Sequence, residues 1–418
     1  MRTVRPVTLC TTVIAAVVAL LIPAAPARAD STRDDQWWLK SLDVAAVHQV
    51  TQGEGVTVAV VDSGVDADHP DLRGNVLPGA DLFDPETQGR VDPHGHGTGV
   101  AALIAGHGHG AGNRSGILGI APKAKILPVR IMRETGVNPP GNVAQGINWA
   151  IDNGADVINV SIGTSYDQAV SAAVERAYQR NIPVVAAAGN KPATPIVDFP
   201  ASHPGAIGVT ITGRKDRITS TNVEGDEIDM AAPGEDIISA VPGGRYNSNT
   251  SSSRATAIAS GAVALVRAKF PTLNAHDVFE RMMWTTRDIG DKGKDLHFGA
   301  GTLDLDRAVT GEPDNRDVAA SPTPAVAART WEDCRGCPST TTRVLQTVAI
   351  FGGLLLVIGL IVFFLVRHKR KKRQGTQGAV PATVFHQSPG SYDQSPAAPP
   401  QPQPPVQDET AWRRPPGS

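Results

Sequence analysis

Short apolar runs alternate with longer amphipathic stretches in the middle of the chain. The apolar runs are bounded by Gly or Asp, which is typical of buried parallel strands; they span residues 56–61, 126–131, 157–160 and 183–188. The stretches with helical spacing span residues 97–105, 143–152 and 168–180. Strands that alternate with helices predict an α/β fold with a parallel central sheet and helices on both faces. Functional residues are then expected at the carboxyl ends of the strands.

The N-terminus, residues 1–29, has the pattern of a secretory signal peptide. Arg2 and Arg5 give it a basic start, an apolar run follows at residues 13–22, and residues 27–29 match a small-x-small cleavage site. We therefore expect an exported protein whose mature chain begins near Asp30.

A second apolar run, residues 344–366, contains no charged residue. A helix of this length spans a bilayer core of about 30 Å, whereas a soluble helix as long would show a polar face. A basic cluster, residues 367–373, follows directly. Because basic residues remain on the cytoplasmic side, we predict a single-pass cell-membrane protein with residues 30–343 outside and its C-terminal tail in the cytoplasm.

The remaining segments divide by composition. The main domain, residues 54–310, follows a lead-in, residues 30–53, that is too short for a separate inhibitory domain. Residues 311–343 are rich in Ala, Pro, Thr and Ser, which indicates a stalk. Residues 367–418 form a basic and then Pro-rich tail with the composition of a disordered segment.

The net charge and the positions of the cysteines bear on nucleic-acid binding, disulfide bonds and zinc binding. The formal net charge is −2 over 418 residues, so the electrostatics give no indication of nucleic-acid binding. The three cysteines, Cys10, Cys334 and Cys337, all lie outside the main domain, which is large enough to fold without disulfides. Cys334 and Cys337 favour a local or intermolecular disulfide, because a zinc site would need a second pair of ligands.

Three polar residues stand next to the predicted strands and helices. Asp62 ends the first apolar run and precedes Ser-Gly, a sequence that is also common in turns. His96 opens a helix of small residues, but a lone histidine is more often structural, and His94 is a nearby alternative. Asn190 follows another apolar run, where an asparagine in a left-handed turn is the ordinary interpretation.

Ser253 opens a further helix of small residues, with Ala255, Ile258, Ala259 and Ala262 at helical spacing. A hydroxyl at this position is most often an N-cap, and it also suits a nucleophile supported by the positive end of the helix dipole. Each signal is weak alone. Their occurrence together, in the order Asp, His, Asn, Ser, is a strong indication of one site.

With these residues in place, the chain resembles the subtilisin-like (S8) serine proteases. The matching stretches are Val-Val-Asp62-Ser-Gly, His96-Gly-Thr-Gly-Val-Ala, Gly-Ile-Ala-Pro122, Asp-Val-Ile-Asn-Val-Ser161-Ile-Gly163, Ala-Ala-Ala-Gly-Asn190, Ala-Ala-Pro233-Gly234 and Ser253-x-Ala-x-Ala with Gly261 downstream. They cover residues 54–310, and the order Asp, His, Ser is that of subtilisin.

The family pattern decides the local alternatives. The Gly-Thr-x-Val-Ala that follows selects His96 over His94, and the spacing to Gly261 selects Ser253 over the two serines before it.

The resemblance also implies roles for individual residues. They are a catalytic triad of Asp62, His96 and Ser253, an oxyanion donor in Asn190, a strand edge for the substrate at Ser161, Ile162 and Gly163, and a pocket wall at Ala187, Ala188 and Gly189. The implied chemistry needs no metal and no cofactor.

Among these proteases, the layout is most similar to the mycosins, which are membrane-anchored and associated with type VII secretion. The shared features are the signal peptide, the short lead-in, the stalk and the single C-terminal membrane helix. The resemblance implies a serine endopeptidase that acts on exported polypeptides as part of a type VII secretion membrane complex. The alternative is a catalytically weak or inactive protease fold that serves as a scaffold in that complex.

Two positions depart from the family pattern. Ser251 and Ser252 stand where the family usually has Gly-Thr before the nucleophile, and Ala257 stands where it usually has Pro. The lost glycine bears on the backbone geometry beside the nucleophile, while Ser252 keeps a hydroxyl in the place of Thr.

A histidine pair lies elsewhere in the domain. His107 and His109 are expected in an exposed loop rather than in a metal site, because no carboxylate is near them in the sequence. The calcium loop common in the family is not recognisable, so no metal site is expected.

Overall fold

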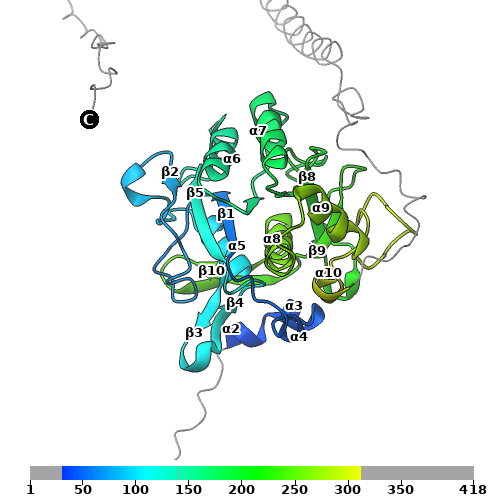
Figure 1. The fold of residues 1–418 in the computed structure, drawn as a ribbon, viewed down its shortest axis with the longest axis horizontal. Helices are drawn as coiled ribbons and strands as arrows, with labels where there is room; N and C mark the ends of the chain where they lie inside the picture. Colours follow the sequence, from blue (N-terminus) through cyan, green and yellow to red (C-terminus); the bar gives the residue numbers. More distant parts are fainter. Residues whose placement is uncertain (1–30, 140, 312–418) are drawn as a thin grey trace, which may run out of the picture. The chain divides into compact units, whose positions relative to one another are not determined.

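The computed structural model describes residues 31–139 and 141–311, and its centre is a parallel sheet (Figure 1). The seven strands have the order β2-β5-β1-β6-β7-β8-β9, and every neighbouring pair is parallel. The strands are β1 (Thr57–Asp62), β2 (Ala80–Asp81), β5 (Lys125–Arg130), β6 (Val157–Val160), β7 (Val184–Ala187), β8 (Ala206–Thr212) and β9 (Met230–Pro233). Parallel strands need crossover connections, and helices at residues 142–152 and 168–179 provide those from β5 to β6 and from β6 to β7.

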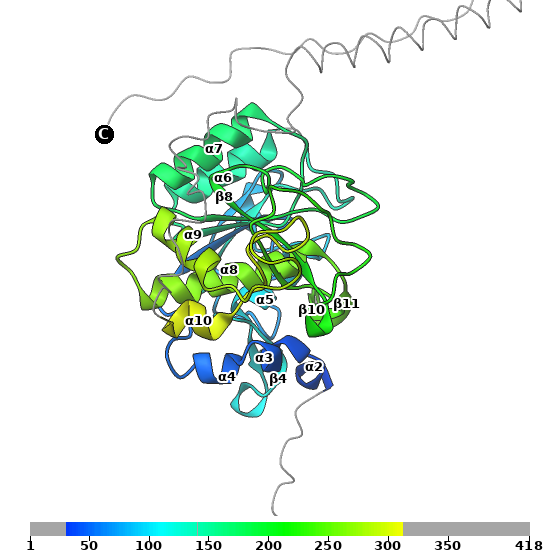
Figure 2. The same ribbon diagram turned by 90° about the vertical axis from the view of Figure 1, so that its right-hand side faces the viewer.

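Helices cover both faces of this sheet, as the sequence predicts. Along β1, Val58 and Val60 belong to a core cluster with α5 (His96–Ala105) and α8 (Ser252–Lys269). The alternate residues Ala59 and Val61 belong to a second cluster with α6 (Asn142–Asp152) and α7 (Gln168–Gln179). Figures 1 and 2 show α6 and α7 on the side of the sheet opposite α8. Since both faces are covered, the strands are apolar almost throughout.

The predicted elements agree with the observed ones to within about a residue at most ends. The four predicted strands correspond to β1, β5, β6 and β7, and the three predicted helices to α5, α6 and α7. The other three strands of the sheet, β2, β8 and β9, were not predicted. Thr210 and Thr212 interrupt the apolar pattern of β8, yet all seven of its residues are buried.

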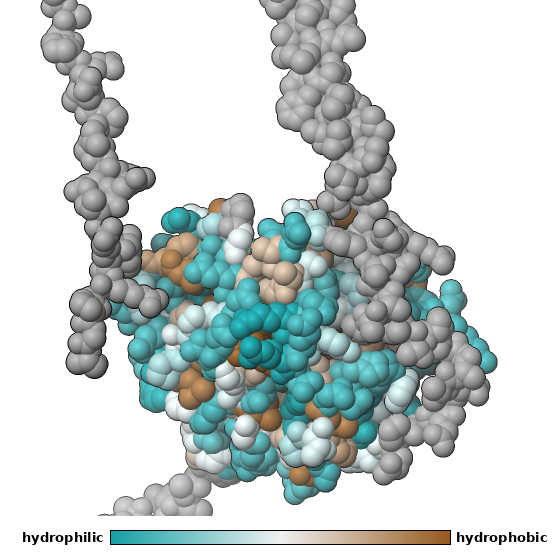
Figure 3. Space-filling model, turned by 45° about the horizontal axis from the view of Figure 1, so that its top comes forward, coloured by the Kyte–Doolittle hydropathy of each residue, from teal (hydrophilic) through white to brown (hydrophobic). Residues whose placement is uncertain are grey.

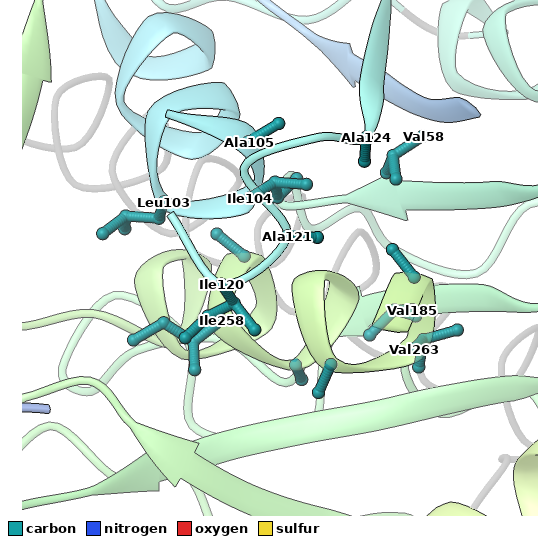
Figure 4. Close-up of a cluster of buried hydrophobic side chains, with 14 of the residues drawn as sticks. Val58, Leu103, Ile104, Ala105, Ile120, Ala121, Ala124, Val185, Ile258 and Val263 are labelled. Carbon is teal, nitrogen blue, oxygen red and sulfur yellow. The ribbon is translucent and has the colours of Figure 1, made fainter. Parts of the chain in front are cut away.

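Helix α8 passes through the core. All its residues from Ser252 to Val266 are buried, and apart from Arg254, Ile258 and Leu265 none of them is larger than valine. At Gly261 a Cβ atom would lie 2.6 Å from Cβ of Ile120, so only glycine fits this contact. Figure 4 shows Ile120 gathered with Ile104 of α5 and Ile258 and Val263 of α8. The helices that begin with His96 and near Ser253 are therefore packed against each other.

The other elements lie around this core. They are the helices α9 (Ala275–Trp284) and α10 (Leu305–Thr310), the antiparallel pairs β3 (His107–His109) with β4 (Ser115–Leu118) and β10 (Ile237–Val241) with β11 (Arg245–Asn249), and the 3-10 turns η1 (Pro85–Thr87), η2 (Ala111–Asn113) and η3 (Arg214–Asp216).

The expectation for His107 and His109 was wrong in two respects. Both residues lie in strand β3 rather than in an exposed loop. A carboxylate distant in the sequence is nearby in space, since His109 Nδ1 lies 2.6 Å from Oδ1 of the buried Asp71. This contact could not be predicted from the sequence, because the two residues are 38 positions apart and only the fold brings them together. Among residues 31–139 and 141–311, no group of three or more His, Cys, Asp or Glu is arranged to hold a metal ion.

The lead-in packs on the domain through three short helices, α2 (Ser31–Asp34), α3 (Trp37–Ser41) and α4 (Val44–Val47), which lie beside β4 in Figure 2. The side-chain amide of Gln36 exchanges two hydrogen bonds of 2.9 Å with the backbone of Leu118, as a neighbouring strand would. Trp38 is completely buried. The indole of Trp37 donates to the carbonyl of Glu235 at 3.1 Å.

No helix in the described part of the chain combines the length and hydrophobicity needed to cross a membrane. The predicted signal peptide (1–29), stalk (311–343, apart from its first residue), membrane helix (344–366) and tail (367–418) lie outside the described residues.

We predict that Trp38 braces the domain. Trp38→Ala removes a fully buried side chain and should lower the free energy of unfolding by about 3–5 kcal/mol, measured by chemical denaturation of the purified protein. The matched control is Trp284→Ala, because Trp284 is 40 % exposed and should change stability by less than about 1 kcal/mol. Equal stability of the Trp38 variant and wild type would contradict a bracing role for the lead-in.

Candidate active site

The four candidate residues meet at one edge of the sheet. Asp62 is the last residue of β1, and Asn190 lies three positions after the end of β7. His96 is the first residue of α5, and Ser253 is the second residue of α8. Because parallel strands end at the same edge, the carboxyl ends of β1 and β7 and the N-termini of the two packed helices converge there.

Asp62 and His96 form a close pair. His96 Nδ1 lies 2.8 Å from Oδ1 and 2.9 Å from Oδ2 of Asp62, whose side chain is completely buried. Burial alone would lower the pKa of His96, but the charge of Asp62 and its hydrogen bond outweigh this effect and raise the pKa above its usual value. With the Nδ1 proton held by Asp62, Nε2 is the ring nitrogen that can accept a proton.

A buried carboxylate fixes the start of the helix that carries His96. Asp92 accepts hydrogen bonds from the backbone N–H of Gly95 at 2.7 Å and from the N–H and hydroxyl of Thr98 at 2.8 and 2.6 Å. It also accepts from the hydroxyl of Ser63, the residue after Asp62, at 2.8 Å. Through these hydrogen bonds Asp92 ties the first turn of α5 to the end of β1. Sequence reasoning missed Asp92, because it lies three residues before the N-cap position, which Gly95 occupies.

Gly97 permits the close approach between that helix and the strand. A Cβ atom on Gly97 would lie 2.1 Å from the carbonyl oxygen of Gly64 and 3.1 Å from Cβ of Asp62. Any larger residue after His96 would push the helix away from Asp62. The glycine of the His-Gly motif is therefore needed so that the helix can approach the end of β1.

Ser253 is buried and hydrogen-bonded to the end of β6. Its Oγ donates to the carbonyl oxygen of Ser161 at 3.0 Å, while Ser161 Oγ donates to the carbonyl of Ser253 at 3.2 Å. Between the described atoms of Ser253 and His96 there is no hydrogen bond. Ser253 Oγ must give up its hydrogen bond to Ser161 before His96 can take its proton, and catalytic hydrogen bonds often form only with substrate bound.

The side chain of Asn190 is oriented by the start of α8. Its Oδ1 accepts a hydrogen bond of 2.8 Å from the backbone N–H of Ser252. Since the oxygen is engaged, the amide nitrogen Nδ2 remains to donate to another acceptor. The N–H of Ser253 lies in the first turn of α8, where backbone donors have no partner within the helix. Neither Asn190 Nδ2 nor the N–H of Ser253 has an acceptor among the described residues.

Ser251 and Ser252 occupy the two positions before Ser253 at which the family usually has Gly-Thr, and the backbone there needs no glycine. Ser251 has φ −162° and ψ 153°, an extended conformation that any residue adopts, so no glycine is required. Its hydroxyl is the N-cap of α8 and accepts from the N–H of Arg254 at 3.4 Å. Ser252 Oγ accepts from the N–H of Gly189 at 3.2 Å. Ser251, and not Ser253, is therefore the residue that caps the N-terminus of α8.

The two segments expected to bind substrate lie at the carboxyl ends of the adjacent strands β6 and β7. In the first, Ser161 is buried and Ile162 is partly buried, and Gly163 is exposed. In the second, Ala187 and Ala188 are buried, and Gly189 has a positive φ of 105°.

Between these segments lies a residue that sequence reasoning missed. The carboxylate of Asp198 approaches so closely that a Cβ atom on Gly163 would lie 2.1 Å from its Oδ2, and one on Gly189 would lie 2.7 Å from it. Nothing in the local sequence of Asp198 distinguishes it from an ordinary loop aspartate, since the loop fold determines its position.

Comparison with known proteins places this geometry in context. A model of the subtilase family, peptidase S8, matches residues 53–301. Subtilisin E of Bacillus subtilis (strain 168) is 36 % identical over 275 residues, which cover 65 % of this chain and 70 % of that protein. The crystal structure of MycP1 with its N-terminal propeptide removed has a TM-score of 0.58 at 28 % identity, covering 66 % of this chain and 97 % of that one. The structure of MycP3 protease from the type VII (ESX-3) secretion system has a TM-score of 0.58 at 28 % identity, and the match covers 70 % of this chain and 91 % of that one.

We predict that the pKa of His96 lies above the usual histidine value of about 6.5, because Asp62 stabilises the charged ring. His96 can then act as a base only at a pH above that raised pKa. Titration by NMR of ¹³C-labelled histidine, with the His96 signal identified by its loss in His96→Ala, should give a midpoint above that value. Asp62→Asn removes the charge, so the midpoint should fall while the other histidine signals keep theirs. An unchanged His96 midpoint in Asp62→Asn would show that the pair does not control the ring.

Proposed function

Because the chain belongs to the subtilase family, and is a serine endopeptidase of the subtilisin class, we propose that residues 54–310 cleave exported polypeptides outside a cell membrane. The observation that carries this proposal is the hydrogen-bonded Asp62–His96 pair at the same sheet edge as Ser253 and Asn190.

The proposed reaction passes through an acyl-enzyme. Ser253 Oγ attacks the peptide carbonyl while His96 Nε2 takes its proton and then delivers it to the leaving amine. Water, deprotonated by His96, hydrolyses the ester and releases Ser253. Asp62 holds the Nδ1–H tautomer and stabilises the imidazolium that forms, which fits the direction of the pKa shift.

The oxyanion is bound by Asn190 Nδ2 and the backbone N–H of Ser253 in this proposal. The hydrogen bond from Ser252 N–H to Asn190 Oδ1 supports it, because it turns the amide nitrogen toward a different acceptor. Removing one such donor from subtilisin costs about 2.7–4 kcal/mol in transition-state stabilisation. Residues 161–163 are proposed to pair with an extended substrate as an edge strand, and residues 187–189 to flank the side chain before the scissile bond.

The proposed site of action rests on two sequence patterns and is supported by the related structures. The N-terminal signal pattern and the apolar run at residues 344–366 support a membrane-anchored protease with its catalytic domain outside and its tail in the cytoplasm. MycP3 is a protease from a type VII secretion system, and its similarity supports an association of this chain with such a membrane complex.

A second candidate function is a protease-fold scaffold in that complex. The observation in its favour is the hydrogen bond of Ser253 Oγ to Ser161 rather than to His96. On the face drawn in Figure 3, however, hydrophobic residues are scattered among polar ones and form no broad apolar docking surface.

We predict that a fluorophosphonate probe labels the purified protein on Ser253, because this reagent needs an activated serine. Peptide mapping should place the adduct on Ser253, and Ser253→Ala should remove it. His96→Ala should abolish labelling and His94→Ala should retain it as the matched control. A folded wild-type protein that takes no label would favour the scaffold, and an adduct on Ser251 or Ser252 would overturn the choice of nucleophile.

We predict an outside-facing domain, on the basis of the basic cluster at residues 367–373. A protease added to intact cells should remove an epitope tag placed before residue 54 and spare a tag placed after residue 418. Loss of the C-terminal tag alone would mean the opposite orientation.

A further inference from the structure

Asp198 presents a carboxylate between the two segments proposed to bind substrate. Its Oδ2 lies against the backbone of Gly163 and of Gly189, at distances that leave no room for a Cβ atom on either residue. Gly189 immediately precedes Asn190, the proposed oxyanion donor. The carboxylate is therefore close to the place where the scissile carbonyl would be bound.

The backbone of Asp198 is held in place on both sides. Its N–H donates to the carbonyl of Ala188 at 2.9 Å, and its carbonyl accepts from the N–H of Ser202 at 3.0 Å. These bonds anchor the residue to the segment after β7. The backbone that carries the carboxylate is consequently anchored next to the proposed oxyanion donor.

The carboxylate itself has no partner among residues 31–139 and 141–311. Neither oxygen makes a hydrogen bond or an ion pair there, and the cation of the same loop, Lys191, is paired with Glu224 at 2.7 Å. Burial raises the pKa of Asp198 to about 6. A partly buried and unpaired carboxylate is unfavourable for the free protein, and a cation brought in by a ligand would relieve that cost.

We propose that Asp198 makes the enzyme select a lysine or arginine immediately before the scissile bond. This inference rests on the proposed function. The ammonium or guanidinium group would lie against the Asp198 carboxylate, with the aliphatic part of the side chain between residues 161–163 and 187–189. In trypsin, an aspartate in the pocket for the residue before the scissile bond gives specificity for basic residues by the same electrostatic match. One carboxylate alone is too few ligands for a metal ion, which leaves a cationic side chain as the matching partner.

The test compares two peptides that differ only in the residue before the scissile bond, lysine in one and norleucine in the other. Norleucine has the same aliphatic chain without the charge. Wild-type protein should favour lysine in kcat/KM by about 10- to 100-fold, the range of a hydrogen bond between charged groups. Asp198→Asn should abolish the preference by lowering the lysine value and raising the norleucine value. The matched control, Asp226→Asn, changes an exposed aspartate and should retain the preference.

The pH dependence adds a readout that a structural role would not produce. His96 acts on both peptides, so its titration cancels in the ratio of their kcat/KM values. Because Asp198 gains its charge as the pH rises through about 6, the lysine-to-norleucine ratio should rise between pH 5 and 7.5. In Asp198→Asn the ratio should be flat over this range.

The outcomes separate the inference from the proposed function. Cleavage of both peptides at similar rates, unaffected by Asp198→Asn, would overturn the role of Asp198 and leave the protease intact. If neither peptide is cut, binding of the fluorescent cation p-aminobenzamidine to Ser253→Ala decides the inference by itself. Binding that is lost on adding Asp198→Asn supports it, and absence of binding to folded Ser253→Ala overturns it.

Discussion

The arrangement of the site depends on one steric constraint, the burial of helix α8 on every side. Its residues from Ser252 to Val266 are all buried, and contacts such as that of Gly261 with Ile120 have no room for one further carbon atom. Protein interiors are close-packed, so a helix held in this way cannot shift without moving the sheet and α5. Ser253 and His96 stand in the first turns of these two helices. The packing of the core therefore sets the geometry of the polar residues at the sheet edge.

Hydrogen bonds between polar groups at the sheet edge also help to fix the geometry of the site. Asp92 and Gly97 fix the first turn of α5 against the end of β1, where Asp62 holds His96. The three carboxylates have different environments: Asp62 is paired with His96, Asp92 accepts hydrogen bonds from Ser63 and the first turn of α5, and Asp198 has no partner in the described residues. In our account these environments correspond to three roles, namely the orientation of the base, the positioning of its helix and the recognition of a substrate cation.

Much of this could be predicted from the sequence, and the exceptions have physical reasons. Apolar runs are a local signal, so β1, β5, β6 and β7 were found, whereas buried threonines concealed β8. Asp62 and His96 were identified by motifs and proved to be hydrogen-bonded. Asp71 beside His109 and Asp198 beside Gly163 were missed, because both contacts join segments that are distant in the sequence. The adequacy of Ser251 in place of glycine depends on a backbone angle that the residue type does not report.

The central claim is that Asn190 and the N–H of Ser253 bind the oxyanion once Ser253 leaves its hydrogen bond to Ser161. A crystal structure of the fluorophosphonate adduct tests it most directly, since the phosphonyl oxygen occupies the position of the oxyanion. We predict a bond from Ser253 Oγ to phosphorus, with the phosphonyl oxygen about 2.7–3.1 Å from both Asn190 Nδ2 and Ser253 N. An adduct whose phosphonyl oxygen points away from Asn190, with Asn190 Nδ2 bonded elsewhere, would contradict the account.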